Sequence, residues 1–161
     1  MLPKRKPTAI PHYDYSQPGA YFITLCVEKR RPILGKIDSS PQVVLSSIGK
    51  IVSDVWYSLP QRFPCLDAIS QSIFVVMPDH IHGILQITAG GASPSPTLHQ
   101  ILGSFISITT IETNRLLGTP GQKLWQRSAY EHILRNQQDF DEAAGYIAEN
   151  PARRLEREEF E

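Results

Sequence analysis

The 161-residue sequence has few of the features that define several protein classes. It holds only two cysteines, Cys26 and Cys65, which lie far apart and form no CxxC pair, so neither a disulfide framework nor a cysteine-rich zinc site is expected. No apolar run is long enough to span a bilayer, and no apolar segment follows the basic start of the chain as it would in a signal peptide. We therefore expect a cytoplasmic protein with no membrane partner.

An excess of charge of either sign is also missing, since 16 Lys and Arg balance 16 Asp and Glu. A strongly basic chain would have indicated nucleic acid directly, and balanced charge alone favours a small-molecule enzyme. Basic residues nevertheless gather early, where residues 1–40 carry seven basic and three acidic side chains. Two clusters, Lys4-Arg5-Lys6 and Lys29-Arg30-Arg31, are candidates for contact with phosphate, although a solvated surface explains them equally well.

The pattern along the chain predicts a single domain over residues 1–161, with an irregular arm at 1–19 and a short charged tail at 152–161. Alternating and β-branched residues predict strands at 20–27, twice within 32–45, on both sides of Pro78-Asp79 within 66–87, and at 130–134. Helical spacing predicts helices from Ser46 or Ser47 to about Leu59, at 97–117, and from Asn136 or Asp139 to about Asn150, with Pro60 and Pro151 as stops and a flexible link at 88–96. This order favours an α+β fold with helices packed on one antiparallel sheet.

The most distinctive short motif is His80-Ile81-His82 in the strand after Pro78-Asp79. Alternate side chains of a strand share one face, so the two imidazoles project together and could hold a metal. Gly83 leaves space for a ligand or a backbone to approach. Two half-exposed histidines on a sheet surface are as good an explanation, and a zinc hydrolase is a further alternative.

The last predicted helix carries Tyr146 and Asn150 four residues apart, hence on one face. If that helix covers the face with His80 and His82, Asn150 can supply a third ligand and Tyr146 lies beside the cation. A phenol, with a pKa near ~10, is a poor nucleophile at neutral pH, and a divalent cation can polarise a phosphate that it attacks. Taken singly, Tyr146 is a packed helix residue and Asn150 a helix cap before Pro151.

Read together, these motifs resemble the HUH single-tyrosine transposases of small insertion sequences. The segment VVMPDHIHGIL at 75–85 resembles their first signature. The segment WQRSAYEHILRNQQDFDEAAGYIAENP at 125–151 resembles the second signature of the branch called REP-associated tyrosine transposases. Further matches occur at 13–15, 18–24, 74–78 and 103–105, and the resemblance covers about residues 4 to 154.

The resemblance implies a ferredoxin-like or RRM-like antiparallel sheet with helices on one face. It implies that His80, His82 and Asn150 hold Mg²⁺ or Mn²⁺, and that Tyr146 is the nucleophile that forms a 5′-phosphotyrosine. The expected substrates are single-stranded DNA hairpins, either REP-like or at insertion-sequence ends. Insertion-sequence relatives work as dimers that exchange tyrosine helices, whereas REP-associated relatives can act as monomers, so the resemblance allows a homodimer.

Weaker candidates for DNA contact complete the set. Tyr13 and Tyr15 could stack on unpaired bases or anchor the arm, and Trp125 could pack or line the hairpin groove. The chain departs from the family at Ile106, where a lysine is usual. That departure, with the neutral charge, keeps a second hypothesis open: a domesticated protein that binds DNA hairpins and has lost most catalytic activity.

Overall fold

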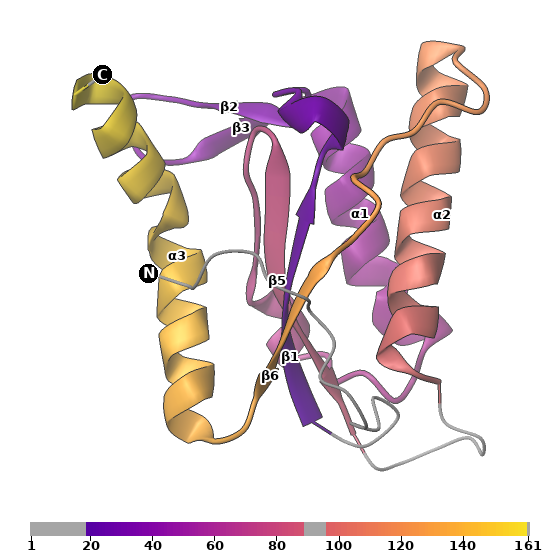
Figure 1. Ribbon diagram of the computed structural model, residues 1–161, viewed down its shortest axis with the longest axis vertical. Coiled ribbons are helices and arrows are strands. Elements are labelled where there is room, and N and C mark those ends of the chain that lie inside the picture. The colour runs from indigo at the N-terminus through magenta and orange to yellow at the C-terminus, as the bar shows by residue number, and fades with distance from the viewer. Residues whose placement is uncertain (1–18, 89–95, 161) are drawn as a thin grey trace.

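The computed structural model describes residues 19–88 and 96–160, which build an α+β domain around one four-stranded sheet (Figure 1). The sheet order is β4-β5-β1-β6, and every neighbouring pair is antiparallel. The strands are β1 (Gly19–Cys26), β4 (Phe74–Val76), β5 (His80–Ile87) and β6 (Tyr130–Leu134). A separate hairpin pairs β2 (Gly35–Ile37) with β3 (Val43–Leu45), as the two short strands within 32–45 predict.

Two helices make the crossovers of this sheet. Helix α1 (Ser47–Arg62) lies between β1 and β4 in the chain, and α2 (Leu98–Leu117) lies between β5 and β6. Each crossover joins two strands that run in the same direction, with a third strand between them. The order β1-α1-β4-β5-α2-β6 is that of a ferredoxin-like fold. The predicted fold class is therefore confirmed.

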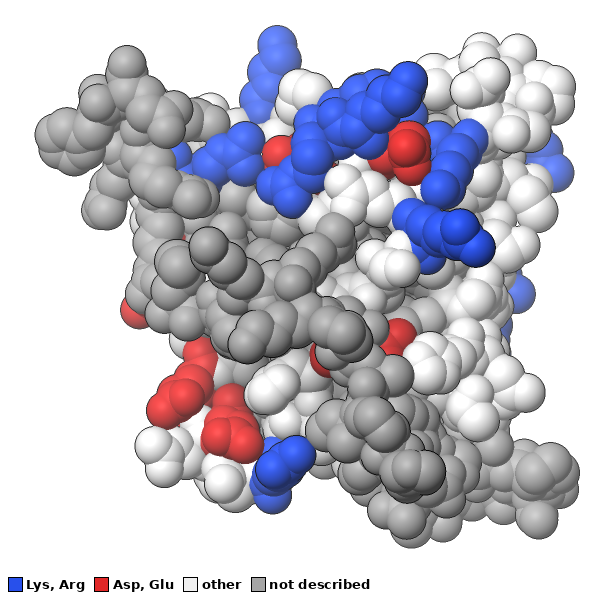
Figure 2. Space-filling view, in the orientation of Figure 1, with Lys and Arg blue, Asp and Glu red and all other residues white. Residues whose placement is uncertain are grey.

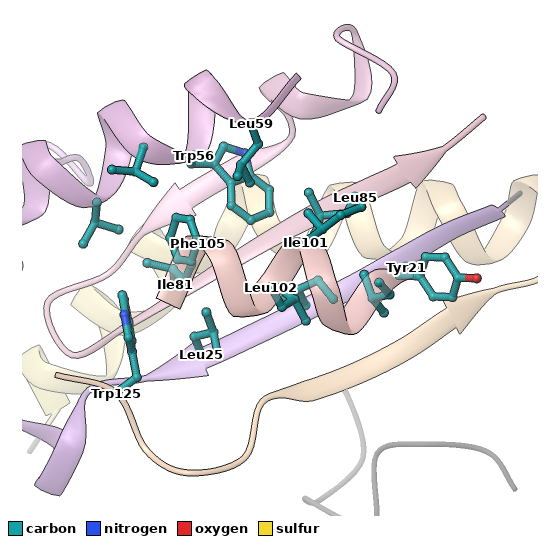
Figure 3. Close-up of a cluster of buried hydrophobic side chains, with 14 of the residues drawn as sticks. Tyr21, Leu25, Trp56, Leu59, Ile81, Leu85, Ile101, Leu102, Phe105 and Trp125 are labelled. Carbon is teal, nitrogen blue, oxygen red and sulfur yellow. The ribbon is translucent and has the colours of Figure 1, made fainter. Parts of the chain in front are cut away.

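The main core lies between the sheet and helices α1 and α2 (Figure 3). Strand residues one position apart face opposite sides, so Leu25 and Ile81 point into this core, where they meet Trp56 of α1 and Phe105 of α2. The side chain that Gly83 lacks would collide with the indole of Trp56, whose Cζ2 lies 2.4 Å from an ideal Cβ. The space at Gly83 thus admits a core side chain, not the ligand or backbone that the sequence suggested.

Helix α3 (Gln137–Phe160) packs on the opposite face of the sheet, which corrects the expectation that the helices share one face (Figure 1). Its residues Ala143 and Ile147 pack with Phe22 of β1 and Ile84 of β5 in a second, smaller cluster. The reason is the alternation of β1 and β5, because both carry apolar side chains on each face, so both faces must be covered. Among the described residues no helix is long and apolar enough to cross a membrane.

Both prolines predicted to end helices lie inside them. Helix α1 continues past Pro60 to Arg62, although Pro60 has no N–H to offer the carbonyl of Trp56. The side-chain amide of Gln71 donates to that carbonyl instead, at 2.9 Å, and the Trp56 indole donates to the Gln71 carbonyl, also at 2.9 Å. Helix α3 likewise continues past the buried ring of Pro151, so the charged tail at 152–160 is helical.

Candidate active site

His80 and His82 lie on the α3 face of β5, where they are paired in register with Cys26 and Thr24 of β1. Their ring centroids are 4.6 Å apart. Both residues are buried, with 7% and 5% of their surface exposed, so they are not the half-exposed pair that an ordinary sheet surface would carry. Shared direction and close approach are what a two-histidine metal clamp requires.

Each imidazole is oriented through its Nδ1 atom. The Nδ1 of His80 lies 2.7 Å from Oδ1 of Asp79, and the Nδ1 of His82 lies 2.8 Å from the hydroxyl of Thr24. These contacts leave Nε2 of each ring as the nitrogen available to a metal. An oxygen behind a histidine that fixes its tautomer and orientation is a regular feature of metal sites.

Burial also favours the neutral form of both rings. Desolvation lowers the pKa of His80, helped by the charges of Arg30 and Arg154 and opposed by Asp79. The pKa of His82 lies well below its usual value, again chiefly through desolvation. Neutral imidazole is the form that binds metals, so both side chains are held ready for ligation.

Helix α3 brings Tyr146 to this pair within the same chain. Asn136 caps the helix, since its side-chain oxygen accepts from the backbone N–H of Asp139 at 2.8 Å. The Tyr146 ring lies edge-on to His82 with centroids 5.3 Å apart, and it also contacts Phe22 at 6.0 Å. The sequence prediction that the final helix lies over the histidine face therefore holds.

Asn150 follows one helical turn after Tyr146 and is buried, with 5% of its surface exposed. Arg154, another turn on, reaches Asp79 with a separation of 3.3 Å between Nη1 and Oδ1. Asn150 thus lies between a residue that contacts His82 and a residue that contacts the carboxylate bound to His80. In the described part of the chain no three His, Cys, Asp or Glu residues form a metal-binding group. Asn150 as a third ligand stays a prediction of the sequence.

Asp79 is the residue at this site that sequence reasoning missed. Its carboxylate is paired with His80, Arg154 and Arg30, the last at 3.2 Å. Burial alone would raise the pKa of Asp79, but these three partners hold it far below its usual range, so the carboxylate is ionised. Its position directly before the His-x-His motif was the available signal, because a carboxylate there can reach the first histidine.

The loop after β1 is shaped to deliver Arg30 to Asp79. Lys29 and Arg30 both adopt left-handed backbone conformations, with φ of 59° and 54°, which non-glycine residues rarely do. Arg31 is exposed, and it donates to the carbonyls of Glu28 at 3.2 Å and Lys123 at 3.4 Å. Arg30 and Arg31, both candidates for DNA contact, therefore lie at the end of the sheet where His80 begins β5.

Other candidates are placed elsewhere. Trp125 is buried in the main core, where its indole donates to Thr109 at 2.9 Å, so it cannot line a hairpin groove. Ile106 packs against the same core, on the face of the sheet away from the histidines. The remaining candidates lie outside the described residues: Lys4, Arg5, Lys6, Tyr13 and Tyr15.

Charge is divided around the site (Figure 2). Basic side chains gather at the top of the view, at the end of the molecule that carries β2, β3 and the start of β5. On the other side of Tyr146, a hollow of about 360 Å³ is lined by Phe22, His132 and the carboxylates of Asp139, Asp141, Glu142 and Glu149. A polyanion is therefore favoured at the basic end and repelled by the acidic hollow.

Comparisons with known proteins point to a fold of the same kind. No protein-family model matches the chain. An uncharacterised protein of Haemophilus influenzae is 28% identical over 162 residues, which cover 91% of this chain and 88% of that protein. A solved REP-associated tyrosine transposase, bound to a REP hairpin, superposes with a TM-score of 0.58 at 18% identity, covering 91% of this chain and 74% of its own.

A crystal structure described as a putative transposase from Deinococcus radiodurans R1 superposes with a TM-score of 0.52 at 15% identity. It matches over 87% of this chain and 95% of its own. The backbone therefore has the fold that the sequence motifs predict. This chain has the fold of the REP-associated tyrosine transposases.

Proposed function

We propose that this protein is a metal-dependent endonuclease and strand transferase for single-stranded DNA, of the transposase type, with Tyr146 as its nucleophile. The observation that carries the proposal is the side-by-side placement of His80, His82 and Tyr146 on one face of the sheet. A purely structural cluster has no need for two neutral imidazoles that share a direction and adjoin a phenol. The solved relative with a bound REP hairpin supports a DNA hairpin as the substrate.

The donor set fits a divalent metal. The Nε2 atoms of His80 and His82, with the amide oxygen of Asn150, offer two nitrogens and one oxygen, which suits Mn²⁺ or Mg²⁺ better than a thiolate-preferring metal. Cys26 and Cys65 belong to no metal-binding group of three or more His, Cys, Asp or Glu among the described residues. When bound, the metal would polarise the scissile phosphate and neutralise charge that develops on its oxygens.

The residues of this chain would carry the reaction as follows. The Tyr146 oxygen attacks phosphorus while its proton passes to solvent. The bond from phosphorus to the 3′ oxygen breaks, and that oxygen takes up a proton and leaves as a 3′ hydroxyl. A 5′-phosphotyrosine remains. A second 3′ hydroxyl then attacks the same phosphorus and releases the phenol, so one phosphodiester replaces another and no ATP is needed.

The direct test is covalent capture of DNA. The variant Tyr146→Phe should form no protein–DNA adduct with a REP-type hairpin oligonucleotide in Mn²⁺, whereas the wild-type protein should form one that migrates as a larger species in denaturing gels. The matched control is Tyr57→Phe, since Tyr57 is 50% exposed on α1 and contacts Phe74 away from the site. An adduct formed by Tyr146→Phe would show that another residue is the nucleophile.

A second candidate is a protein that binds DNA hairpins without cutting them. The balanced charge and the acidic hollow beside Tyr146 favour it, because both weaken contact with phosphate near the phenol. If the protein binds the hairpin but does not cleave it, with or without Mn²⁺, the binding function is supported over strand transfer.

A further inference from the structure

The carboxylate of Asp79 joins three parts of the molecule at one point. Its Oδ1 is shared by His80 Nδ1, at 2.7 Å, and Arg154 Nη1, at 3.3 Å, while its Oδ2 accepts from Arg30. The histidine belongs to β5, Arg154 to α3 and Arg30 to the turn after β1. The side chain of Asp79 is only 9% exposed, whereas those of Arg154 and Arg30 are 23% and 50% exposed.

The described apolar contacts of α3 with the sheet include residues of its first half. Ala143 and Ile147 are its members of the buried cluster on this face, and Phe140, Ala144 and Tyr146 pack around them. Beyond Ile147 the described buried residues of the helix are Asn150 and Pro151. Among the residues of this second half whose side chains are described, Arg154 reaches across to the sheet end through its contact with Asp79.

Arg154 lies on the same side of α3 as the two candidate site residues of that helix. Tyr146, Asn150 and Arg154 follow one another at intervals of four residues, which places them along one side of α3. Tyr146 adjoins His82 at one end of this row, and Arg154 adjoins Asp79 at the other. Any rotation or lifting of the second half of α3 would move Asn150 with it, while Tyr146 could keep its contact with His82.

We propose that Asp79 and Arg154 are positioning residues: the Asp79 carboxylate orients His80 and, through Arg154, fixes the second half of α3 so that Asn150 stays over the histidine pair. This role deepens the proposed function and rests on it for its purpose. The contact itself can be tested without DNA or metal. The Asp79 carboxylate thereby positions two candidate ligands: His80 on β5 directly, and Asn150 on α3 through Arg154.

The first experiment is amide hydrogen exchange on the full-length protein, free of metal and DNA. In Arg154→Gln the amides of residues 147–154 should exchange at least about tenfold faster than in the wild type, while those of residues 139–146 and of β1 and β5 change less than about twofold. Arg154→Lys should restore most of the protection because it keeps the positive charge. Arg135→Gln is the matched control, since Arg135 is an exposed arginine before α3.

The second experiment separates positioning from mere support of the fold. Arg154→Gln should lower Mn²⁺ affinity, measured by calorimetry without DNA, by about tenfold, as loss of an orienting partner commonly does. Asp79→Asn should lower it as well, and the double variant should bind Mn²⁺ no more weakly than Asp79→Asn alone, because Asp79→Asn already disrupts the contact with Arg154. The His80 Nδ1 proton, followed by nitrogen NMR, should remain in Arg154→Gln.

Three results would overturn the inference: unchanged exchange in Arg154→Gln, faster exchange spread evenly over the sheet and all of α3, or additive losses in the double variant. None of these depends on cleavage. If the wild-type protein forms no DNA adduct, the proposed function is rejected. If Arg154→Gln still shows the expected change in exchange relative to the wild type, the positioning role of Asp79 and Arg154 remains supported.

Discussion

Each imidazole of the histidine pair is held from behind by an oxygen of a different kind. Asp79 gives His80 a charged acceptor, whereas Thr24 gives His82 a neutral hydroxyl. When Nε2 binds a metal, Nδ1 carries the proton and donates to these oxygens. The hydroxyl of Thr24 is therefore expected to fix the tautomer of His82 without adding charge to an already buried site.

The variant Thr24→Val tests that expectation. Valine has the shape and strand preference of threonine, so the fold should persist, but His82 loses its acceptor and Mn²⁺ affinity should fall by about tenfold or more. Isothermal calorimetry measures the change. Thr110→Val on α2, across the sheet, is the matched control. Equal affinities for Thr24→Val and the wild type would show that the hydroxyl does not orient His82.

At the scale of elements, α1 shows how a proline can lie inside a helix. Pro60 removes one backbone donor, and the Gln71 side chain supplies another to the Trp56 carbonyl. The Trp56 indole fills the space beside Gly83, so the same contact anchors α1 to the sheet. A buried carbonyl without a donor costs free energy, and here a residue 15 positions away prevents that cost.

Replacing Gln71 with alanine should lower the free energy of unfolding by about 2 kcal/mol, because the Trp56 carbonyl loses its donor. In a Pro60→Ala background the backbone N–H of residue 60 can serve that carbonyl, so the same replacement should cost less. Urea denaturation of the four proteins measures both effects. An equal cost in the two backgrounds would mean that Gln71 does not stand in for the proline.

A buried carboxylate connects β6 to α2 and makes stability depend on pH. Glu131 has a side chain only 5% exposed and lies 3.0 Å from His99 Nε2. Desolvation raises the pKa of Glu131, although His99 opposes that effect. The pKa of Glu131 is thus higher in the folded state than in the unfolded state, where it is about 4.3. Glu131 therefore contributes to the free energy of unfolding below a pH of about 4.3, and this contribution is lost as the pH rises through the folded-state pKa.

Glu131→Gln does not titrate, and its amide oxygen can still accept from His99. It should therefore be more stable than the wild type by about 1 kcal/mol at pH 8, with the difference closing as pH falls toward about 4. Chemical denaturation across this pH range provides the measurement, with the exposed Glu142→Gln as the control. A difference that grew as pH fell would refute the assignment.

For the whole molecule, the main consequence of the fold is that one chain brings histidines and tyrosine together. Helix α3 covers its own sheet, so the predicted site forms without a partner chain. A homodimer that exchanges tyrosine helices stays a prediction of the family resemblance. The two arrangements differ in which chain delivers Tyr146 to a given pair of histidines.

Mixing two inactive variants distinguishes these arrangements. If each chain uses its own tyrosine, a mixture of Tyr146→Phe and His82→Ala should form no DNA adduct, just as either variant alone forms none. If helices are exchanged, the mixture should regain up to about a quarter of the wild-type adduct per site, because one site in four would combine an intact pair with an intact tyrosine. Gel analysis of a labelled hairpin reads the outcome.

Local sequence patterns predicted much of the secondary structure and of the candidate site. The strand alternation of His80 and His82, the spacing of Tyr146 and Asn150, and the Asn136 cap depend on neighbours a few residues away, and the structure has them as expected. Trp125 was open to two interpretations, because an aromatic residue beside a strand packs or binds ligands equally well until its surroundings are known. Pro60 did not end its helix, because Gln71, a residue outside the helix, supplies the missing donor.

The sequence by itself determined the candidate chemistry: two imidazoles in one direction, a phenol and an amide on one helix side, and an α+β order of elements. Only the tertiary structure decided which face of the sheet α3 covers, and that Asp79 binds Arg30 and Arg154 as well as His80. The physical reason is the separation in sequence between the residues that interact. Periodicity sets the direction of side chains within an element, whereas burial and ion pairs depend on residues far apart in the sequence, such as Asp79 and Arg154, 75 positions apart, which only the packed chain brings into contact.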